Sequence, residues 1–294
     1  MPGILLLLLL PAALWAQAEP AALLEARTLA ELARYEETFD GALGVAAIDL
    51  ATGRSFALNG DTLFAQASVI KIPILVRLFH AAREGGLRFS DKVTLEPRDA
   101  VGGSGTLALD LKKGPVTLTV GDLAEAMMVV SDNTATNTLI RMAGGMERVN
   151  RMLEGHGFRH TRLRRVMMDA AAARRDDENT STPNDMARLV EQIYRAKIVD
   201  AEASREILAI MRRVPGGIRK GLPAGVEAAV KTGSIPGVRG EAGIVFVPER
   251  PFALSVMSAF LAGDGLTPVA EAARIVYRMF DRLSRSNRYG HRVR

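Results

Sequence analysis

Cysteine is absent from this 294-residue sequence, and aromatic side chains make up only 5% of it. Without cysteine there is no disulfide, no thiol nucleophile, no cysteine-ligated zinc and no lipid-modified cysteine. Stability must therefore come from the packing of side chains. The composition, 48% hydrophobic and 24% charged, is that of an ordinary globular protein with a substantial core rather than a disordered or fibrous chain.

Lysine and arginine are missing from the first 18 residues, which form an apolar run that ends in Ala-Gln-Ala at 16–18. A run of this length followed by a small-x-small site is typical of a secretory signal peptide. It is shorter than the roughly 20 residues that span a membrane, and Pro11 interrupts it. We therefore predict a signal peptide at residues 1–18, a secreted or periplasmic mature chain from Glu19, and no stable membrane insertion after cleavage.

Acidic residues are missing from the tail, residues 282–294, which contributes to the net charge of +5. A basic patch can contact nucleic acid, but no nucleic-acid-binding motif accompanies this one, and an exported protein rarely meets nucleic acid. We expect a solvated tail, no nucleic-acid partner and a monomeric protein.

Strand patterns occur near both ends of the chain, and helical patterns fill the middle. Two early strands alone are too few for a useful sheet, so the late strands are expected to join them. This predicts an α/β (α+β) fold of two lobes: a five-stranded antiparallel sheet flanked by N- and C-terminal helices, from residues 19–61 and 212–294, and an inserted all-helical lobe, from residues 62–211. The strand-like segments are 43–50, 54–58, 226–233, 242–248 and 252–262. The helical patterns cover 20–39, 70–84, 119–130, 135–142, 146–156, 183–196, 201–211 and 268–283.

Ser68 and Lys71 lie three residues apart at the start of one apolar, helix-patterned segment. This spacing puts both side chains on the same face of a helix. A serine hydroxyl becomes a good nucleophile when a neighbouring base takes its proton, and burial lowers the pKa of a lysine enough to make it that base. The alternative is a helix-capping serine beside a lysine whose amine reaches the surface.

Two further motifs place polar side chains at the ends of predicted elements. Ser-Asp-Asn at 131–133 begins a helical pattern, and Lys-Thr-Gly at 231–233 ends a strand. The first motif either caps its helix or aims a hydroxyl and an amide into a cleft. The second is either a surface turn or a site for a substrate carboxylate, with a glycine that lets the ligand approach the backbone.

In this order, the three motifs resemble those of the class A β-lactamase family and of penicillin-binding proteins. The likeness runs over nearly the whole mature chain. The matching segments are SVIK at 68–71, SDNTATN at 131–137, TRL at 161–163, TSTP at 180–183, LPAG at 222–225 and KTG at 231–233. The resemblance implies the two-lobed serine β-lactamase fold and an acyl-enzyme mechanism that needs no metal or organic cofactor.

The resemblance also implies a role for each matching polar residue. Ser68 would attack the carbonyl of a β-lactam or of a D-Ala-D-Ala-type peptide, and Lys71 would take its proton. Ser131, helped by Lys231, would pass a proton to the leaving nitrogen. The other implied contacts are Asn133 with the substrate side-chain amide, Lys231, Thr232 and Gly233 with the carboxylate end, and the N–H groups of Ser68 and Ser234 with the oxyanion.

The loop after Leu163 departs from the family pattern. The glutamate that activates the deacylating water is replaced by Met167, or by Val166 if the loop is counted back from Pro183, and the accompanying asparagine is replaced by alanine. A thioether cannot take a proton from water, so rapid hydrolysis by the usual route is not expected. Asp169 is the nearest carboxylate, and is either a substitute base or a loop residue that caps backbone N–H groups.

Two other parts of the expected cleft differ from the family. The arginine that usually binds the substrate carboxylate falls on Ala242, and Arg239 is close enough in sequence to take its role. The glycine-rich segment 102–105 stands where the family has an aromatic cleft wall. This predicts a more open entrance, suited to a bulkier ligand such as a cell-wall peptide.

Three functions remain consistent with the sequence. The first is a secreted serine β-lactamase whose Ser68 acyl-enzyme is released slowly because Met167 replaces the glutamate. The second is a penicillin-binding D,D-peptidase that acts on peptidoglycan peptides and forms stable β-lactam adducts. The third is a non-catalytic envelope-binding protein on the same scaffold, which the retention of Ser68, Lys71, Ser131 and Lys231 disfavours because no fold needs four such polar groups together.

Overall fold

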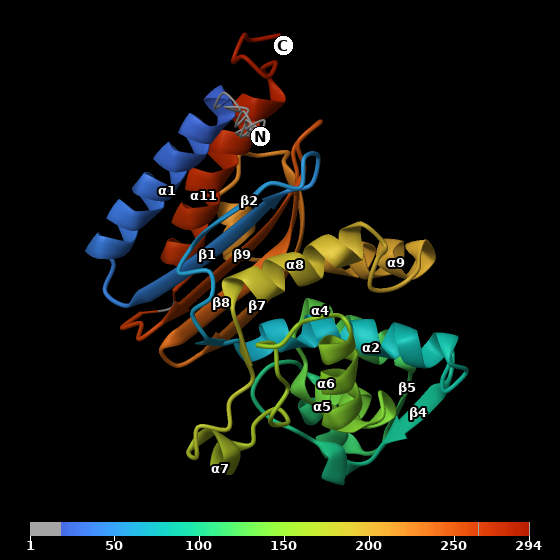
Figure 1. Ribbon diagram of the computed structural model, residues 1–294. Helices are drawn as coiled ribbons and strands as arrows, with labels where there is room; N and C mark the ends of the chain where they lie inside the picture. Colours follow the sequence, from blue (N-terminus) through green and yellow to red (C-terminus); the bar gives the residue numbers. More distant parts are fainter. Residues whose placement is uncertain (1–18, 264, 294) are drawn as a thin grey trace, which may run out of the picture.

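A five-stranded antiparallel sheet organises the computed structural model, which describes residues 19–263 and 265–293 (Figure 1). The strands are β1 (Ala42–Asp49), β2 (Ser55–Leu58), β7 (Glu227–Ile235), β8 (Val238–Phe246) and β9 (Phe252–Ala259). Their order across the sheet is β2-β1-β9-β8-β7. The early and late strands therefore share one sheet, as predicted, with β7 at its edge. The predicted signal peptide at 1–18 lies outside the described residues.

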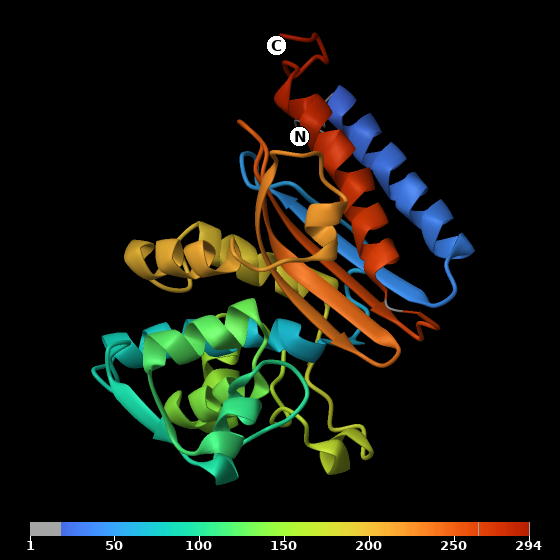
Figure 2. The ribbon, with the colours of Figure 1, turned by 180° about the vertical axis from the view of Figure 1, so that it is seen from behind.

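One face of the sheet is covered by α1 (Pro20–Thr38) and α11 (Leu266–Ser284), which lie side by side, with the short α10 (Gly217–Lys220) next to them (Figure 2). Val45, Val230 and Val256 point from the strands into this core. Phe252 stacks on Phe280 of α11 with ring centroids 4.2 Å apart. The flanking N- and C-terminal helices are thus held by apolar burial.

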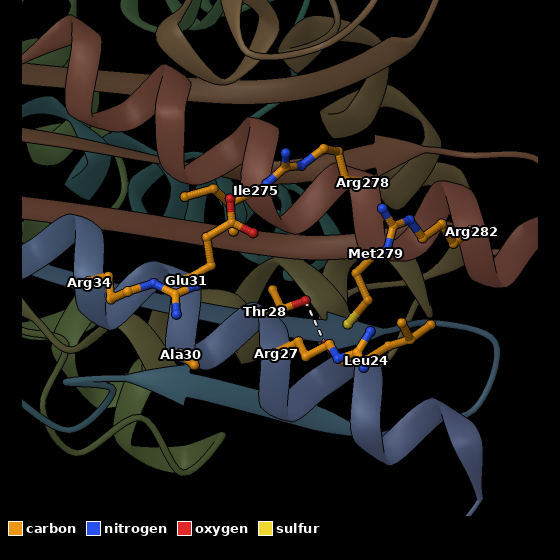
Figure 3. Close-up of a pocket in the computed structure, with 10 residues that line it drawn as sticks. All are labelled: Leu24, Arg27, Thr28, Ala30, Glu31, Arg34, Ile275, Arg278, Met279 and Arg282. Atoms are coloured by element: carbon orange, nitrogen blue, oxygen red, sulfur yellow. Dashed lines mark hydrogen bonds and ion pairs between the residues drawn. The ribbon is translucent and has the colours of Figure 1, made fainter.

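The groove between α1 and α11 is strongly basic at its rim (Figure 3). Arg27 and Arg34 of α1, and Arg278 and Arg282 of α11, line it together with Glu31. Arg278 forms an ion pair with Glu31, which ties the two helices together. Part of the protein's positive charge therefore lies on the outer face of the sheet.

The other face of the sheet packs on α8 (Pro183–Tyr194), which contacts β1, β8 and β9. α9 (Ala201–Met211) packs against the edge strand β7 and α8. The remaining larger helices lie beyond α8: α2 (Lys71–Arg83), α4 (Val120–Val129), α5 (Asn133–Met142) and α6 (Gly145–Gly155). Sheet residues such as Ile48 and Ile244 belong to the same buried cluster as the α2 residues Ile72 and Leu75. One hydrophobic core therefore joins the sheet to the helical part.

The inserted segment is mainly helical, as predicted, but it is not all-helical. It contains a hairpin-like pair, β4 (Lys92–Leu95) with β5 (Val116–Thr119), and a two-residue pair, β3 (Phe64–Ala65) with β6 (Thr180–Ser181). These strands have two to four residues, too few for an alternating pattern to stand out from the surrounding sequence. Within the described part of the chain, no helix is both long and apolar enough to cross a membrane.

The short helical turns are a further addition to the sequence prediction. They are η1 (Ala67–Ile70), η2 (Pro97–Asp99), α3 (Leu107–Asp110), η3 (Leu111–Lys113) and α7 (Ala170–Ala173). Two of them, η1 and α7, lie at the functional site described next.

Candidate active site

Ser68 lies in the 3₁₀ turn η1, directly before α2. The residue that caps α2 is Ile70, so Ser68 is not the capping serine of the alternative interpretation. The backbone N–H of Lys71 donates to the Ser68 carbonyl, which fixes the two residues one turn apart. Ala67, just before the serine, has a φ of +47°, a conformation that costs a non-glycine residue roughly 1–3 kcal/mol.

The Lys71 amine is fully buried beside the second motif. Its Nζ lies 2.7 Å from the Ser131 carbonyl oxygen, 3.0 Å from the Ser131 Oγ and 3.1 Å from the Asn133 Oδ1. Burial, followed by the nearby charge of Lys231, holds the pKa of Lys71 well below its ordinary value, although the Asp132 carboxylate opposes the shift. A lowered pKa favours the neutral amine, which is the form that can accept a proton.

Ser131 is free of helix capping because its neighbour takes that task. Asp132 caps α5, with its Oδ1 accepting the N–H of Ala135 at 2.8 Å. The φ of Ser131 is +58°, and its Oγ lies between two amines, 3.0 Å from Lys71 Nζ and 3.3 Å from Lys231 Nζ. A hydroxyl in this position can pass a proton between neighbouring groups.

Lys231 enters the site from the edge strand β7, and its side chain is also fully buried. Its Nζ donates to the Thr232 carbonyl at 2.7 Å. Burial lowers the pKa of Lys231 to about 7, with a raising effect from the Glu241 carboxylate and a lowering one from Arg239. Lys231 therefore changes its charge near neutral pH.

Asn133 connects the site to the glycine-rich segment 102–105. Its Nδ2 donates to the Gly102 carbonyl at 3.0 Å, and its backbone N–H donates to the Ser104 carbonyl at 3.1 Å. Gly103 approaches Met168 on the other side, where a Cβ would lie 2.9 Å from the Met168 sulfur. Gly103 therefore packs closely between Asn133 and Met168, whereas a Cβ on Gly102 would meet nothing within 4 Å.

Gly233 brings β7 against the turn that carries the serine. A Cβ at this position would lie 2.6 Å from the Ser68 nitrogen and 2.7 Å from the Gln66 carbonyl oxygen. No larger residue allows this approach without displacing backbone. The close contact puts Ser234, the next residue, at the cavity beside Ser68, as two N–H donors for one oxyanion require.

A cavity of about 460 Å³ opens in front of these groups. Ser68, Asn133 and Ser234 line one side, and Met167 and Met168 of the 164–179 loop line the other. In Figure 1 this loop, which contains α7, lies below the sheet and to one side of the helices. The cavity therefore lies between the serine and the loop in which the family glutamate is missing.

The loop is pinned at its base by the matching segments TRL and TSTP. Arg162 and Thr180 exchange both backbone hydrogen bonds, at 2.9 and 3.1 Å. The Asn179 Oδ1 accepts the N–H of Arg164 at 2.8 Å. Glu178 binds the Arg165 guanidinium with both carboxylate oxygens, at 3.0 and 2.9 Å. The residues inside the loop consequently have fixed positions.

Met167 of the loop lines the same cavity as Ser68. The Asn137 side chain of α5 holds its backbone from both sides: Met167 N–H donates to Oδ1 at 2.8 Å, and Nδ2 donates to the Met167 carbonyl at 3.1 Å. Only 7% of Met167 is exposed, and it lines the cavity. Of the two residues that the sequence leaves for the glutamate position, Met167 is the one that lines the cavity.

Asp169 has the contacts of a helix cap. Its Oδ1 accepts the N–H of Ala172 at 2.9 Å at the start of α7. Among the described residues that line the cavity, the other carboxylate belongs to Glu178, which is paired with Arg165. Both acids at the cavity thus already accept hydrogen bonds from the protein.

Arg239 is tied to an acid that the sequence analysis did not single out. Its Nη2 donates to the Oε1 of Glu241 at 2.8 Å, and Glu241 is fully buried. Arg239 was predicted to bind a substrate carboxylate, which requires that its positive charge be free to do so. In the structure that charge is balanced by Glu241, two residues along the strand. The sequence did contain one signal for this ion pair: a glutamate directly before a predicted strand, two residues after an arginine.

A serine at a cavity, a buried lysine able to take its proton, and a second hydroxyl placed between two amines define a serine acyl-transfer enzyme. Lysine serves as the base in this arrangement, in place of the histidine of the better-known triads. Within residues 19–263 and 265–293, no three His, Asp or Glu side chains gather as metal ligands would.

Comparison with known proteins agrees with the assignment as a serine acyl-transfer enzyme. The sequence matches the family described as "Beta-lactamase enzyme family" over residues 26–280. It is 27% identical over 262 residues to the beta-lactamase SME-1 of Serratia marcescens, an alignment that covers 85% of this chain and 88% of that protein. The chain therefore belongs to the β-lactamase enzyme family.

Solved structures show the same likeness. PBP-A superposes with a TM-score of 0.78 and 29% identity, over 87% of this chain and 96% of PBP-A. A mutant of PBP-A, solved as an acyl-enzyme complex with penicillin G, gives a TM-score of 0.78 at 29% identity, over 88% and 97%. The beta-lactamase from Sphaerobacter thermophilus DSM 20745 gives 0.77 at 26% identity, over 86% and 97%. The relatives thus include both β-lactamases and PBP-A.

Proposed function

We propose that this chain is a secreted serine hydrolase that opens β-lactams through an acyl-enzyme on Ser68 and releases the product slowly. The observation that carries the proposal is the buried Lys71 amine, one turn after Ser68 and 3.0 Å from the Ser131 hydroxyl. The geometry argues against a non-catalytic binding protein, because burying two lysines together costs stability without structural benefit.

The acylation step uses each group of the site once. The Ser68 Oγ forms a bond to the lactam carbonyl carbon while its proton passes to the neutral amine of Lys71. The negative charge that develops on the carbonyl oxygen is stabilised by the N–H groups of Ser68 and Ser234. As the lactam C–N bond breaks, Ser131 gives its proton to the nitrogen and regains one from the lysine ammonium groups beside it.

Deacylation is the step for which the site is poorly equipped. Water must lose a proton as it attacks the ester, and the Met167 thioether cannot accept that proton. We therefore propose a long-lived acyl-enzyme. The same property supports a second function, a penicillin-binding D,D-peptidase whose natural acyl donors are D-Ala-D-Ala-type peptides. The likeness to PBP-A also supports this second function.

Stopped-flow kinetics with nitrocefin test the proposal. We expect a burst of about one nitrocefin opened per protein molecule, because acylation is faster than release, followed by a slow steady rate. A fast steady rate without a burst would contradict slow release, and no colour change at all would contradict acylation.

Replacing Asp169 with alanine tests whether this residue is a substitute base. We expect the decay rate of the benzylpenicillin adduct to change by less than about threefold, because removing a helix cap costs only about 1 kcal/mol locally. Adduct lifetime measured by mass spectrometry checks this. A lifetime at least about 100-fold longer in the variant would instead identify Asp169 as the base.

Replacing Gly233 with alanine is expected to slow acylation by benzylpenicillin by at least about 100-fold, because the added Cβ collides with the Ser68 nitrogen and displaces the oxyanion donors. Gly155→Ala is the matched control, since a Cβ there meets nothing within 4 Å. Rates of adduct formation and thermal unfolding of both variants measure the effect. Equal acylation rates in the two variants would show that the close approach of β7 is not needed.

The pKa of Lys231 predicts the pH dependence of acylation. Lys231 loses its positive charge as the pH rises through about 7, so its attraction for the penicillin carboxylate weakens. We expect the second-order acylation rate to fall about tenfold between about pH 7 and about pH 8.5. In Lys231→Arg, whose guanidinium stays charged, the fall should disappear. An unchanged fall in that variant would assign it to another group.

A further inference from the structure

A charge pair, Arg239 with Glu241, lies on β8 beside the Lys-Thr-Gly motif of β7. Glu241 lies directly across from Thr232 in the β7–β8 ladder, and Arg239 lies across from Ser234. Residues paired in this way have side chains on the same face of the sheet, as do residues two apart on one strand. The pair therefore lies next to the residues expected to hold a substrate carboxylate.

Glu241 is fixed in this place by the backbone as well as by Arg239. Its Oε1 accepts the N–H of Gly217 at 2.7 Å, and its Oε2 accepts the N–H of Ile218 at 2.9 Å, both at the start of α10. A Cβ on Gly216 would lie 2.6 Å from Oε2 and 2.7 Å from the Thr232 Cγ2. The carboxylate, the α10 start and Thr232 thus form one tightly packed unit.

The Glu241 carboxylate changes the charge that a substrate meets. It is fully buried and accepts hydrogen bonds from two backbone N–H groups and from the Arg239 guanidinium. Arg239 and Glu241 together then contribute no net charge. A substrate carboxylate placed at Thr232 is attracted by Lys231 but gains nothing from Arg239, and it lies close to a second carboxylate.

We propose that the Arg239–Glu241 pair makes Glu241 a specificity-determining residue: because Glu241 balances the charge of Arg239, this site lacks the preference for a free carboxylate that the family resemblance implies, and acyl donors with a neutral group in that place, such as an amide, react equally well. This inference rests on the proposed acyl-enzyme function. For a peptide substrate, it means that a chain that continues or is amidated beyond the scissile bond is accepted as well as one that ends there in a carboxylate.

Benzylpenicillin and its carboxamide form the test pair, because they carry the same reactive ring and differ only in this group. Rates of Ser68 acylation are measured by mass spectrometry at pH 8, where Lys231 is mostly neutral, and each is divided by the rate of hydroxide hydrolysis of the same compound. For the natural protein we expect a carboxylate-to-amide ratio within about threefold of one.

Glu241→Gln keeps the size of the side chain and removes its charge. Because this leaves the charge of Arg239 unbalanced, we expect the ratio to rise at least about tenfold in favour of the carboxylate. In the double variant Arg239→Gln with Glu241→Gln, the ratio should return to near one. Thermal unfolding of each variant confirms that the comparison is made on folded protein.

A natural ratio above about tenfold, or a ratio that falls in Glu241→Gln, would overturn the inference and show that Glu241 holds Arg239 in place for a substrate carboxylate. Absence of an adduct with either compound would contradict the proposed function itself. The two failures are therefore distinguishable.

Discussion

Replacement of Ser68 by alanine is expected to abolish covalent labelling by benzylpenicillin, with acylation slowed by at least about 10⁴-fold. The reason is that Ser68 carries the hydroxyl that both lines the cavity and lies one turn before Lys71. The Ser131 hydroxyl is near Lys71, but it is held between two amines and serves as a proton relay. Intact-protein mass spectrometry measures the labelling.

The fold should survive this change. Ser68 lines the cavity, and its removal leaves no buried polar partner unpaired among the hydrogen bonds of the Lys71 amine. Ser104→Ala is the matched control, since Ser104 lines the same cavity and contributes its backbone carbonyl to Asn133. Labelling that persists in Ser68→Ala would exclude Ser68 as the nucleophile. Labelling lost equally in Ser104→Ala would show that the loss reports a damaged cavity and not a missing nucleophile.

Replacement of Met167 by glutamate is expected to shorten the life of the acyl-enzyme by at least about 100-fold, the usual effect of a well-placed general base. The Asn137 side chain holds the backbone of residue 167 from both sides, so a glutamate there would point into the same cavity as the methionine. Its carboxylate would then reach the water that attacks the Ser68 ester. Decay of the benzylpenicillin adduct gives the rate.

Two control variants separate a base from a change in packing. Met167→Gln has nearly the same shape but no basic group, and Met168→Glu puts a carboxylate on the neighbouring residue, which is 59% exposed and has a φ of +63°. Neither should speed the decay. If the adduct decays as fast in Met167→Gln as in Met167→Glu, the faster decay comes from a change in loop packing and not from a new base. The proposed reason for slow release would then be wrong.

The sheet and the three motifs could be predicted from the sequence because their signals are local. Strands of eight or nine residues such as β1, β7 and β9 contain enough apolar residues to be recognised. The spacing of Ser68 and Lys71 by itself puts the two on one helical face. The roles of Ser131 and Lys231 came from the resemblance, and the structure brings their side chains within 3.3 Å.

Backbone strain at the site could not be predicted. Ala67, Ser131 and Met168 have φ values of +47°, +58° and +63°, although none is a glycine or asparagine, the residues that usually signal this conformation. Ser131 is held there by the Lys71 amine, which donates to its carbonyl oxygen and contacts its Oγ. Such conformations depend on tertiary packing and leave no mark on the local sequence.

Glu241 was missed for a similar reason. A single glutamate in a strand is usually read as a residue facing solvent. Its burial depends on the N–H groups of Gly217 and Ile218, which are more than 20 residues away in sequence. Arg239 was predicted from its sequence position to bind the substrate carboxylate, but its ion pair with Glu241 became evident only with the β7–β8 register.

The most direct test of the account is intact-protein mass spectrometry over time, after residues 19–294 are mixed with excess benzylpenicillin. The account predicts a single adduct on Ser68 that forms at once and persists for hours, because Lys71 supports acylation and Met167 cannot support deacylation. An adduct that appears and vanishes within seconds while the drug is consumed would contradict slow release and demand another base. A protein that never gains the adduct mass would contradict the acyl-enzyme itself.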